Sequence, residues 1–284
     1  MQFAVVAHRT SETNDALAGA AASLGLPAAV LSPRDALRTL EPGDIALGRL
    51  DVRDELDGVE RGTEELEQLA AGGAVLLNPP SALVAAHDKL LTARILRRAG
   101  VPHPRTWWIA DGAPTVAPEL PVVLKPRFGS WGRDVVLCPT AADLDRELAR
   151  CASRPWFHEH GALAQELIPP LGWDLRVVVA GGAIVGGARR VAAPGEWRTN
   201  VALGGHIEPA TPPPLARKLA LEAAAAIRGD LVGIDLLPLG DGFVVSEVNG
   251  AVDFRPAYAL GPGNVFRCAV YELARAARLR RAAA

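Results

Sequence analysis

Apolar and polar positions alternate in blocks over residues 1–86, and the blocks predict strands separated by helices. The predicted strands cover residues 2–7, 28–31, 44–50 and 74–77, and the predicted helices cover 16–24 and 64–71. Strands that alternate with helices form a parallel sheet that is covered on both faces. Because no GxGxxG follows the first strand, the pattern gives a dinucleotide site no support.

A second unit is predicted after the Asn-Pro-Pro run at 78–80. Asp88 is well placed as the N-cap of a helix that ends at Gly100. We expect the buried stripe of this helix at Leu91, Ile95 and Ala99. Strands are predicted at 122–125, 134–138 and 162–168, with a glycine-rich turn at 129–132 and a helix capped by Thr140.

A third unit begins near Asp174. The strands predicted at 175–180 and 183–188 are joined by Gly181-Gly182, which is typical of a hairpin turn. Helices are predicted over 215–227 and from about residue 264 onward.

The stretch 233–249, GIDLLPLGDGFVVSEVN, predicts a second hairpin, because two apolar runs flank Gly240-Asp241-Gly242. With a three-residue loop, Leu239 faces Phe243 and Asp235 faces Glu247. A slip of one residue in this register would turn Asp235 to the other face.

Two opposed carboxylates among apolar neighbours require a positive charge between them. Asn249 lies two residues beyond Glu247, on the same face, and completes a set of three oxygen ligands suited to Mg²⁺. The sequence therefore predicts a metal site formed by Asp235, Glu247 and Asn249. The alternative is a solvated edge hairpin, in which acidic side chains are ordinary, but these strands are too apolar for an edge facing water.

Composition narrows the class of protein. The 284 residues carry a formal net charge of −2, which gives no bias toward nucleic acid. The three cysteines are widely spaced and form no CxxC, so we expect reduced thiols rather than a disulfide or zinc framework. Since no apolar run reaches membrane-spanning length or forms a secretory signal, we expect a soluble cytoplasmic protein without a membrane partner.

Three further stretches carry candidate binding residues. In VVLKPRFGSWGRDVVL, Lys125 precedes the turn Gly129-Ser130-Trp131-Gly132, whose amide groups suit phosphate; the alternative is a glycine-containing hairpin with an exposed lysine. In QELIPPLGWDLRVVV, the polar groups are Gln165, Glu166, Asp174 and Arg176, and the alternative is an amphipathic strand with an ion pair. In ARRVAAPGEWRTNVALGG, they are Arg189, Arg190, Arg198, Thr199 and Asn200, and the alternative is a solvated charged loop.

KPRFGSWGR, QELI followed by DLR, RTNVALGG, GID and EVN occur in an order and spacing that resemble the ATP-grasp superfamily. Within it, the chain resembles the RimK-like carboxylate–amine ligases, and its GSWGR and RTNVALGG look most like the LysX-type ligases of lysine biosynthesis. The resemblance covers about residues 87–250. It implies an α/β (α+β) fold: a pre-ATP-grasp α/β domain at 1–86, a small ATP-grasp subdomain with the glycine-rich loop at 87–170, and a large subdomain with the metal and substrate site at 171–284.

The resemblance also implies residue roles. Lys89 and Lys125 match the ATP lysines, and Gly129, Ser130, Trp131, Gly132 and Arg133 match the loop over the phosphates. Gln165, Glu166 and Leu167 match the strand end and adenine hinge, Asp174 the ribose side, and Arg176 and Arg190 the phosphate side. Arg198, Thr199 and Asn200 match the segment near the transferred phosphate, with Arg198 and Asn200 catalytic. Asp235, Glu247 and Asn249 match the Mg²⁺ ligands, with Mn²⁺ as an alternative metal.

The implied activity is ATP-dependent amide formation through an acyl phosphate, with release of ADP and phosphate. The expected substrates are an amino acid such as glutamate or 2-aminoadipate and a peptide or small acidic carrier protein, and the expected assembly is a homo-oligomer. Alternatives are a small-peptide ligase of the same fold and an inactive nucleotide-binding regulator. The segment after Asn249 reads Gly-Ala-Val-Asp-Phe where many relatives have a Pro-Gly turn. This departure leaves the identity of the amino acid open.

Overall fold

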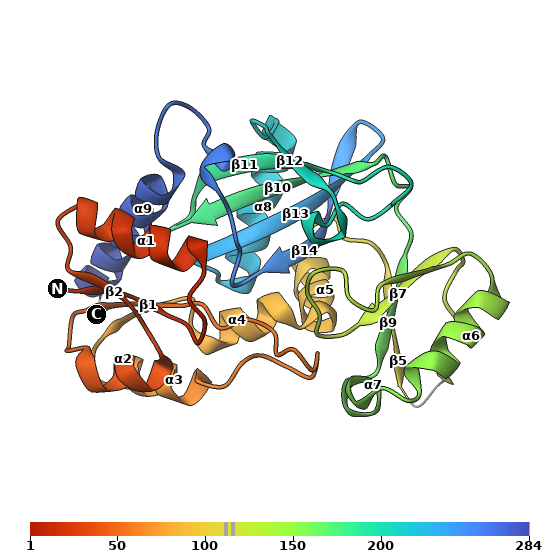
Figure 1. The fold of residues 1–284 in the computed structure, drawn as a ribbon, viewed down its shortest axis with the longest axis horizontal. Coiled ribbons are helices and arrows are strands. Elements are labelled where there is room, and N and C mark those ends of the chain that lie inside the picture. The colour runs from red at the N-terminus through yellow and green to blue at the C-terminus, as the bar shows by residue number, and fades with distance from the viewer. Residues whose placement is uncertain (111–112, 115–116, 284) are drawn as a thin grey trace.

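The computed structural model describes residues 1–110, 113–114 and 117–283. Three sheets organise the chain, and they lie in three parts that follow one another in sequence (Figure 1). The boundaries predicted at 86/87 and 170/171 fall between the sheets, and the division into domains stays a prediction.

The first sheet is parallel, with strand order β2-β1-β3-β4. Its strands are β1 (Phe3–Val6), β2 (Ala28–Leu31), β3 (Ile45–Gly48) and β4 (Val75–Leu77). The side chains of β1 alternate between two cores, so helices cover both faces, as the sequence predicts. α2 (Pro33–Thr39) and α3 (Thr63–Ala71) cover one face, and α1 (Glu12–Ser23) and α9 (Val265–Ala283) the other. The terminal helix therefore returns to the first unit (Figure 1).

Two consecutive helices lead out of the first unit. α4 (Pro80–His87) was not predicted, and α5 (Lys89–Arg98) begins where Asp88 accepts hydrogen bonds from the amides of Leu90 and Leu91, both at 3.1 Å. The stripe predicted for α5 is wrong in part. Leu91 and Ile95 are half-buried and pack against a hydrophobic core, as predicted, but Ala99 is exposed, and Leu90, Ala93 and Leu96 are the buried apolar residues. α5 contacts β5 (Thr106–Ala110) of the second unit as well as α8 (Pro214–Ile227) and β14 (Gly242–Asn249) of the third, so its buried positions are not confined to one stripe.

The second sheet is antiparallel, with strand order β6-β5-β9-β7-β8. Its strands are β5 (Thr106–Ala110), β6 (Ala113–Pro114), β7 (Val122–Pro126), β8 (Val136–Cys138) and β9 (Ala162–Glu166), and its helices are α6 (Ala141–Cys151) and α7 (Pro155–His160). The capping box of Thr140 and Asp143 is confirmed. β5 and α7 were not predicted. The glycine-rich turn between β7 and β8 faces the third sheet (Figure 1).

The third sheet has strand order β12-β11-β10-β13-β14. Its strands are β10 (Trp173–Ala180), β11 (Ala183–Val191), β12 (His206–Pro209), β13 (Leu231–Leu239) and β14 (Gly242–Asn249). α8 (Pro214–Ile227) packs on one face, and the core on the other face includes α9. The hairpin turn at Gly181-Gly182 is confirmed. Among the described residues, no helix combines the length and apolarity needed to cross a membrane.

The hairpin at 231–249 differs from the prediction at its turn and agrees at its acidic pair. The loop has two residues, so Leu239 pairs with Gly242 and not with Phe243. A bulge at Ser246 inserts one residue into β14 and moves the register back, so that Asp235 pairs with Glu247 as predicted. The Ser246 hydroxyl donates to the carbonyl of Asp235 at 3.1 Å, which fixes the bulge beside the carboxylate.

Candidate active site

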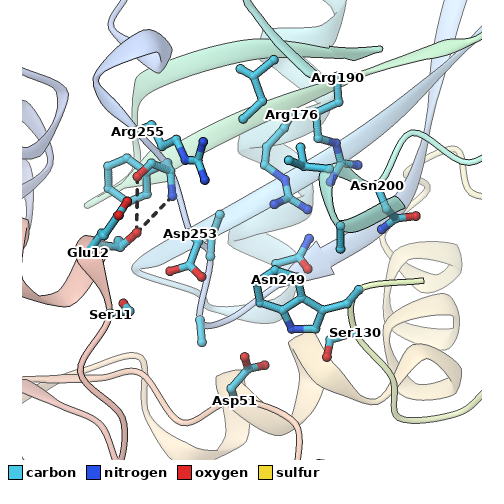
Figure 2. A pocket seen from close by; sticks show the side chains of 18 of the residues that line it. Ser11, Glu12, Asp51, Ser130, Arg176, Arg190, Asn200, Asn249, Asp253 and Arg255 are labelled. Atoms are coloured by element: carbon cyan, nitrogen blue, oxygen red, sulfur yellow. Dashed lines mark hydrogen bonds between the residues drawn. The ribbon is translucent and has the colours of Figure 1, made fainter. Parts of the chain in front are cut away.

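Apart from Arg189, whose guanidinium lies over the Trp173 ring, every candidate site residue named from the sequence lines one cavity between the second and third sheets. These residues are Lys89, Lys125, Gly129, Ser130, Trp131, Gly132, Arg133, Gln165, Glu166, Leu167, Asp174, Arg176, Arg190, Arg198, Thr199, Asn200, Asp235, Glu247 and Asn249. A second cavity lies beside the first and shares part of its wall, including Arg176, Arg190, Asn200 and Asn249 (Figure 2). The fold thus gathers the predicted set, and the individual roles stay predictions.

The positive charge that the opposed carboxylates require comes from three basic side chains. Arg176 donates from Nε and Nη2 to the two oxygens of Asp235, both at 2.7 Å, and Arg190 adds a bond of 2.8 Å. Burial raises the pKa of Asp235, but the two guanidinium groups outweigh it and bring the pKa to about 2. Asp235 is therefore ionised at neutral pH, although the residue is only 2 % exposed.

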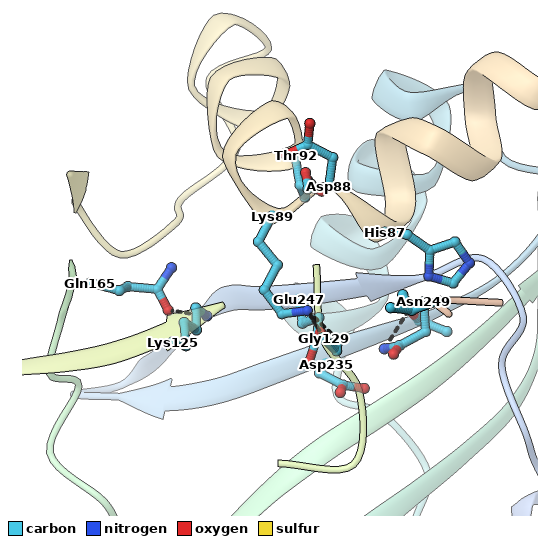
Figure 3. Close-up of polar contacts among 12 residues, drawn as sticks. His87, Asp88, Lys89, Thr92, Lys125, Gly129, Gln165, Asp235, Glu247 and Asn249 are labelled. Carbon is cyan, nitrogen blue, oxygen red and sulfur yellow. Dashed lines mark hydrogen bonds and ion pairs between the residues drawn. The ribbon is translucent and has the colours of Figure 1, made fainter. Parts of the chain in front are cut away.

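Glu247 is held by a lysine rather than by arginines. Lys89 Nζ lies 2.8 Å from Glu247 Oε1 and also donates to the carbonyl of Gly129 (Figure 3). Burial and the nearby Asp235 raise the pKa of Glu247, but Lys89 and Lys125 together outweigh them, so the pKa falls below its ordinary value. Asn249 extends from the same strand, with its Nδ2 3.5 Å from the carbonyl of Gly233. No group of three His, Cys, Asp or Glu side chains that could hold a metal occurs in the described residues, so the predicted ligand set of Asp235, Glu247 and Asn249 depends on the Asn249 amide.

Lys125 is a buried cation on β7. Its Nζ donates to Gln165 Oε1 at 2.7 Å, and Gln165 in turn donates to the hydroxyl of Thr106 at 3.0 Å. Burial lowers the pKa of Lys125 to about 8, although Glu247 acts in the opposite direction. The ammonium group is thus poised to gain from an anionic ligand.

ATP binding is expected to weaken as the pH rises through about 8, the pKa of Lys125 in the free protein. Above that pH the neutral amine must take up a proton to bind phosphate, so affinity should fall by up to about tenfold per pH unit. Calorimetric titration between pH 7 and 9.5 measures this slope. Lys125→Met keeps the apolar stem and should bind ATP more weakly, with a flatter pH dependence. An equal slope in both proteins would assign the effect to another group.

Asp174 and Arg190 form a buried pair that continues the network of Asp235. Arg190 donates to both oxygens of Asp174, through Nε at 2.7 Å and through Nη2, and Thr199 donates its hydroxyl to Asp174 at 2.6 Å. The carboxylate predicted to face a ribose is thus engaged by two protein partners. In this structure Asp174 connects the loop after β11, through Thr199, to Arg190, which also holds Asp235.

Arg198 connects that loop to the glycine-rich turn. Its Nη1 lies 3.3 Å from the carbonyl of Gly132 and 3.2 Å from that of Val135, and Nε and Nη2 donate to Glu196 at 3.0 and 2.8 Å. Bonds from Arg198 lower the pKa of Glu196 to about 2. Sequence reasoning missed Glu196, although its position two residues before Arg198 was a signal. If Arg198 binds the transferred phosphoryl group, its guanidinium must release Glu196 and donate to the phosphoryl oxygens instead.

The remaining predicted residues lie at the rim of the cavity. Arg133 Nη1 donates to the carbonyl of Asp54 at 3.2 Å, so the glycine-rich turn touches the first unit. Glu166 accepts from the amide of Arg105 at 3.0 Å at the end of β9. Gly132 has φ +73°, and a Cβ there would lie 2.9 Å from Asn200 Oδ1, so the close approach of the two loops requires glycine.

Solved structures share this architecture over the full chain. D-Alanine–D-alanine ligase from Bacillus anthracis, complexed with ATP, superposes with a TM-score of 0.70 at 15% identity and with 100% of each chain covered. At this identity the likeness shows the fold, which is that of the ATP-grasp ligases. Residues 86–258, more than half of the chain, match the RimK-like ATP-grasp domain. The chain belongs to this family, whose members include carboxylate–amine ligases.

Relatives of known name are amino-acid ligases. The coenzyme γ-F420-2:α-L-glutamate ligase of Methanococcus maripaludis is 30% identical over 229 residues, which cover 77% of this chain and 78% of the relative. The α-aminoadipate–LysW ligase LysX of Saccharolobus solfataricus is 30% identical over 198 residues, covering 68% and 72%. The chain spans 64% of the probable α-L-glutamate ligase of Thioalkalivibrio sulfidiphilus, at 34% identity.

Proposed function

We propose that the protein joins a carboxylate to an amine with ATP and releases ADP and phosphate. The observation that carries this proposal is the opposed pair Asp235 and Glu247, each neutralised by cations from another element, in one cavity with Lys125 and the glycine-rich turn. Fixed charges of both signs around a polyphosphate site supply the positioning and neutralisation that phosphoryl transfer requires.

The donor set fits a divalent cation. Asp235 and Glu247 face each other across a ladder, and Asn249 adds a neutral oxygen from the same strand. Mg²⁺, or Mn²⁺ in its place, would supply charge neutralisation on the phosphate oxygens when bound. Arg176 and Lys89 now hold the carboxylates, and both line the cavity, so they can turn from carboxylate to phosphate as the carboxylates take up a cation.

The nucleotide residues would divide the cavity into regions. Lys89, Lys125, Arg176 and Arg190 would bind phosphates, Glu166 and Leu167 would border the adenine, and Asp174 would lie near the ribose. The cavity measures about 190 Å³, less than the roughly 300–1,000 Å³ of most ligand pockets. The turn at 129–133 would therefore move outward to admit ATP and close again over its phosphates.

The reaction would take place in two balanced steps. An oxygen of the substrate carboxylate attacks the γ-phosphorus, the bond to the bridging oxygen breaks, and ADP leaves. The amine nitrogen then attacks the acyl carbon, a C–N bond forms, the C–O bond to phosphate breaks, and phosphate leaves while the nitrogen loses its proton. Arg198 and Asn200 would bind the transferring phosphoryl group, where fixed donors have the largest effect.

The substrates would be an amino acid and a carboxylate of a peptide or carrier protein, in a cytoplasmic homo-oligomer. Names of the relatives support this class, because they specify glutamate, a coenzyme, aminoadipate and the carrier LysW for those proteins. Purified protein screened against amino acids and carrier peptides should release ADP with a matching pair only. ATP binding without ADP release from any pair would instead indicate a nucleotide-binding regulator.

A further inference from the structure

The second cavity has room for one small molecule beside the first cavity, which we call the nucleotide cavity. The volume of the second cavity is about 290 Å³, at the lower end of ligand pockets, so it suits an amino acid better than a peptide. We call this second cavity the acceptor cavity. It lies between the start of α1, the loop after β3 and the segment 251–255, and it shares Asn200 and Asn249 with the nucleotide cavity (Figure 2).

The segment 251–255 presents two opposite charges to the acceptor cavity. Val252 and Phe254 are 1 % and 2 % exposed, and Asp253 and Arg255, which follow them in turn, line the cavity (Figure 2). Thr13 fixes the segment, because its hydroxyl exchanges hydrogen bonds of 3.3 Å with the carbonyl and the amide of Phe254. An ammonium and a carboxylate on one small ligand would match this pair.

A buried arginine stands behind Asp253. The Arg49 side chain is 2 % exposed, its Nη2 lies 3.5 Å from Asp253, and its Nη1 has no partner in the described part of the chain. Burial lowers the pKa of Arg49, whereas the charges of Asp253 and Asp51 raise it, so both carboxylates interact electrostatically with the guanidinium. The guanidinium is thus directed at the acidic wall of the cavity.

Two further carboxylates, Glu12 and Asp51, also line the acceptor cavity. Within the described ranges, neither lies within 4.0 Å of a lysine or arginine nitrogen; the nearest basic group of Asp51 is His87, at 3.9 Å. Arg176 and Arg190 reach the same wall but are already matched by Asp235 and Asp174. When those pairs are set aside, three carboxylates, Glu12, Asp51 and Asp253, line the cavity. They face two guanidinium groups, that of Arg255 on the wall and that of Arg49 behind Asp253, so one carboxylate is in excess.

We propose that the acceptor cavity binds the amine substrate and that this substrate is an amino acid with a second cationic group on its side chain. Asp253 and Arg255 would bind the α-amino and α-carboxylate groups, and Asp51 and Glu12 would bind the side-chain cation. An acidic side chain would face these two carboxylates unpaired, which selects against it. This inference rests on the proposed function and differs from the substrates in the relatives' names.

The test is calorimetric titration of the full chain with Mg²⁺ and a non-hydrolysable ATP analogue, using L-lysine, L-norleucine and L-glutamate as probes. Lysine should bind at least about tenfold more tightly than norleucine, the ratio that about 1.4 kcal/mol from one charged hydrogen bond supplies. The double variant Asp51→Asn, Glu12→Gln should bind lysine and norleucine equally, with norleucine affinity unchanged. Asp241→Asn, in the exposed turn of the last hairpin, is the matched control and should keep the preference.

Preference for glutamate, a lysine preference that survives in the double variant, or binding of none of the probes would each overturn the inference. Asp253→Asn should weaken lysine and norleucine alike, and its melting temperature shows whether Arg49 still folds into place. Failure of the ATP analogue itself to bind, measured first in the same cell, would count against the proposed function instead.

Discussion

Glu247→Gln is expected to lower turnover by at least about 100-fold while the protein melts within a few degrees of the wild type. Mutation of a residue that only orients a metal ligand lowers metal affinity or activity by about 10- to 100-fold. Removing the charge of a ligand itself should lower turnover at least as much. Stability should change little, because the substitution removes the ion pair with Lys89 at 2.8 Å and also relieves the opposition to Asp235. Steady-state ADP release and a thermal melt measure the two effects.

Glu222→Gln is the matched control for Glu247→Gln. Glu222 also faces a lysine, Lys218 at 3.8 Å, but on the exposed surface of α8. Its substitution should leave turnover and melting unchanged. A Glu247→Gln protein with full turnover and a raised melting temperature would show that the acidic pair is only a strained structural feature.

Arg198→Ala should lower turnover by about 10²- to 10³-fold, the usual cost of removing one donor from a developing oxyanion. ATP affinity should change little, because the guanidinium reaches the glycine-rich turn only through bonds of 3.2 and 3.3 Å to two carbonyls. Single-turnover measurements and nucleotide titration separate the two quantities.

Arg146→Ala removes a guanidinium that also pairs with a carboxylate, Asp143 at 2.6 Å, but is 62 % exposed on α6. It should behave as the wild type. If Arg198→Ala instead weakened ATP binding as strongly as it lowered turnover, Arg198 would serve to hold the glycine-rich turn closed and not to stabilise the phosphoryl group.

The acidic pair shows how far local sequence can predict a site. Asp235 and Glu247 face each other as predicted, but the prediction assumed a three-residue loop, and the structure has a two-residue loop and a bulge at Ser246 that offset each other. Turn residues and apolar alternation fix which runs pair. They do not show whether an extra residue lies in the loop or in the strand, since both give the same count.

Features that depend on packing between units were not predicted from the sequence. The stripe of α5 was wrong in part, because Leu91 and Ile95 pack half-buried against the core beside α8 while Ala99 lies exposed at the helix end. Glu196 was missed because only its ion pair with Arg198 gives it a role. The acceptor cavity joins Glu12, Asp51 and Asp253, which are far apart in the chain, and only the departure after Asn249 drew attention to it.

The nucleotide product formed with hydroxylamine tests the central claim most directly. Hydroxylamine replaces the amine substrate, so that only the carboxylate varies in a screen with ATP and Mg²⁺. We expect a matching carboxylate to yield its hydroxamate together with ADP and phosphate in equal amounts, and Arg198→Ala to yield far less of all three. Hydroxamate formed together with AMP and pyrophosphate would mean an adenylate intermediate and would contradict the acyl-phosphate mechanism.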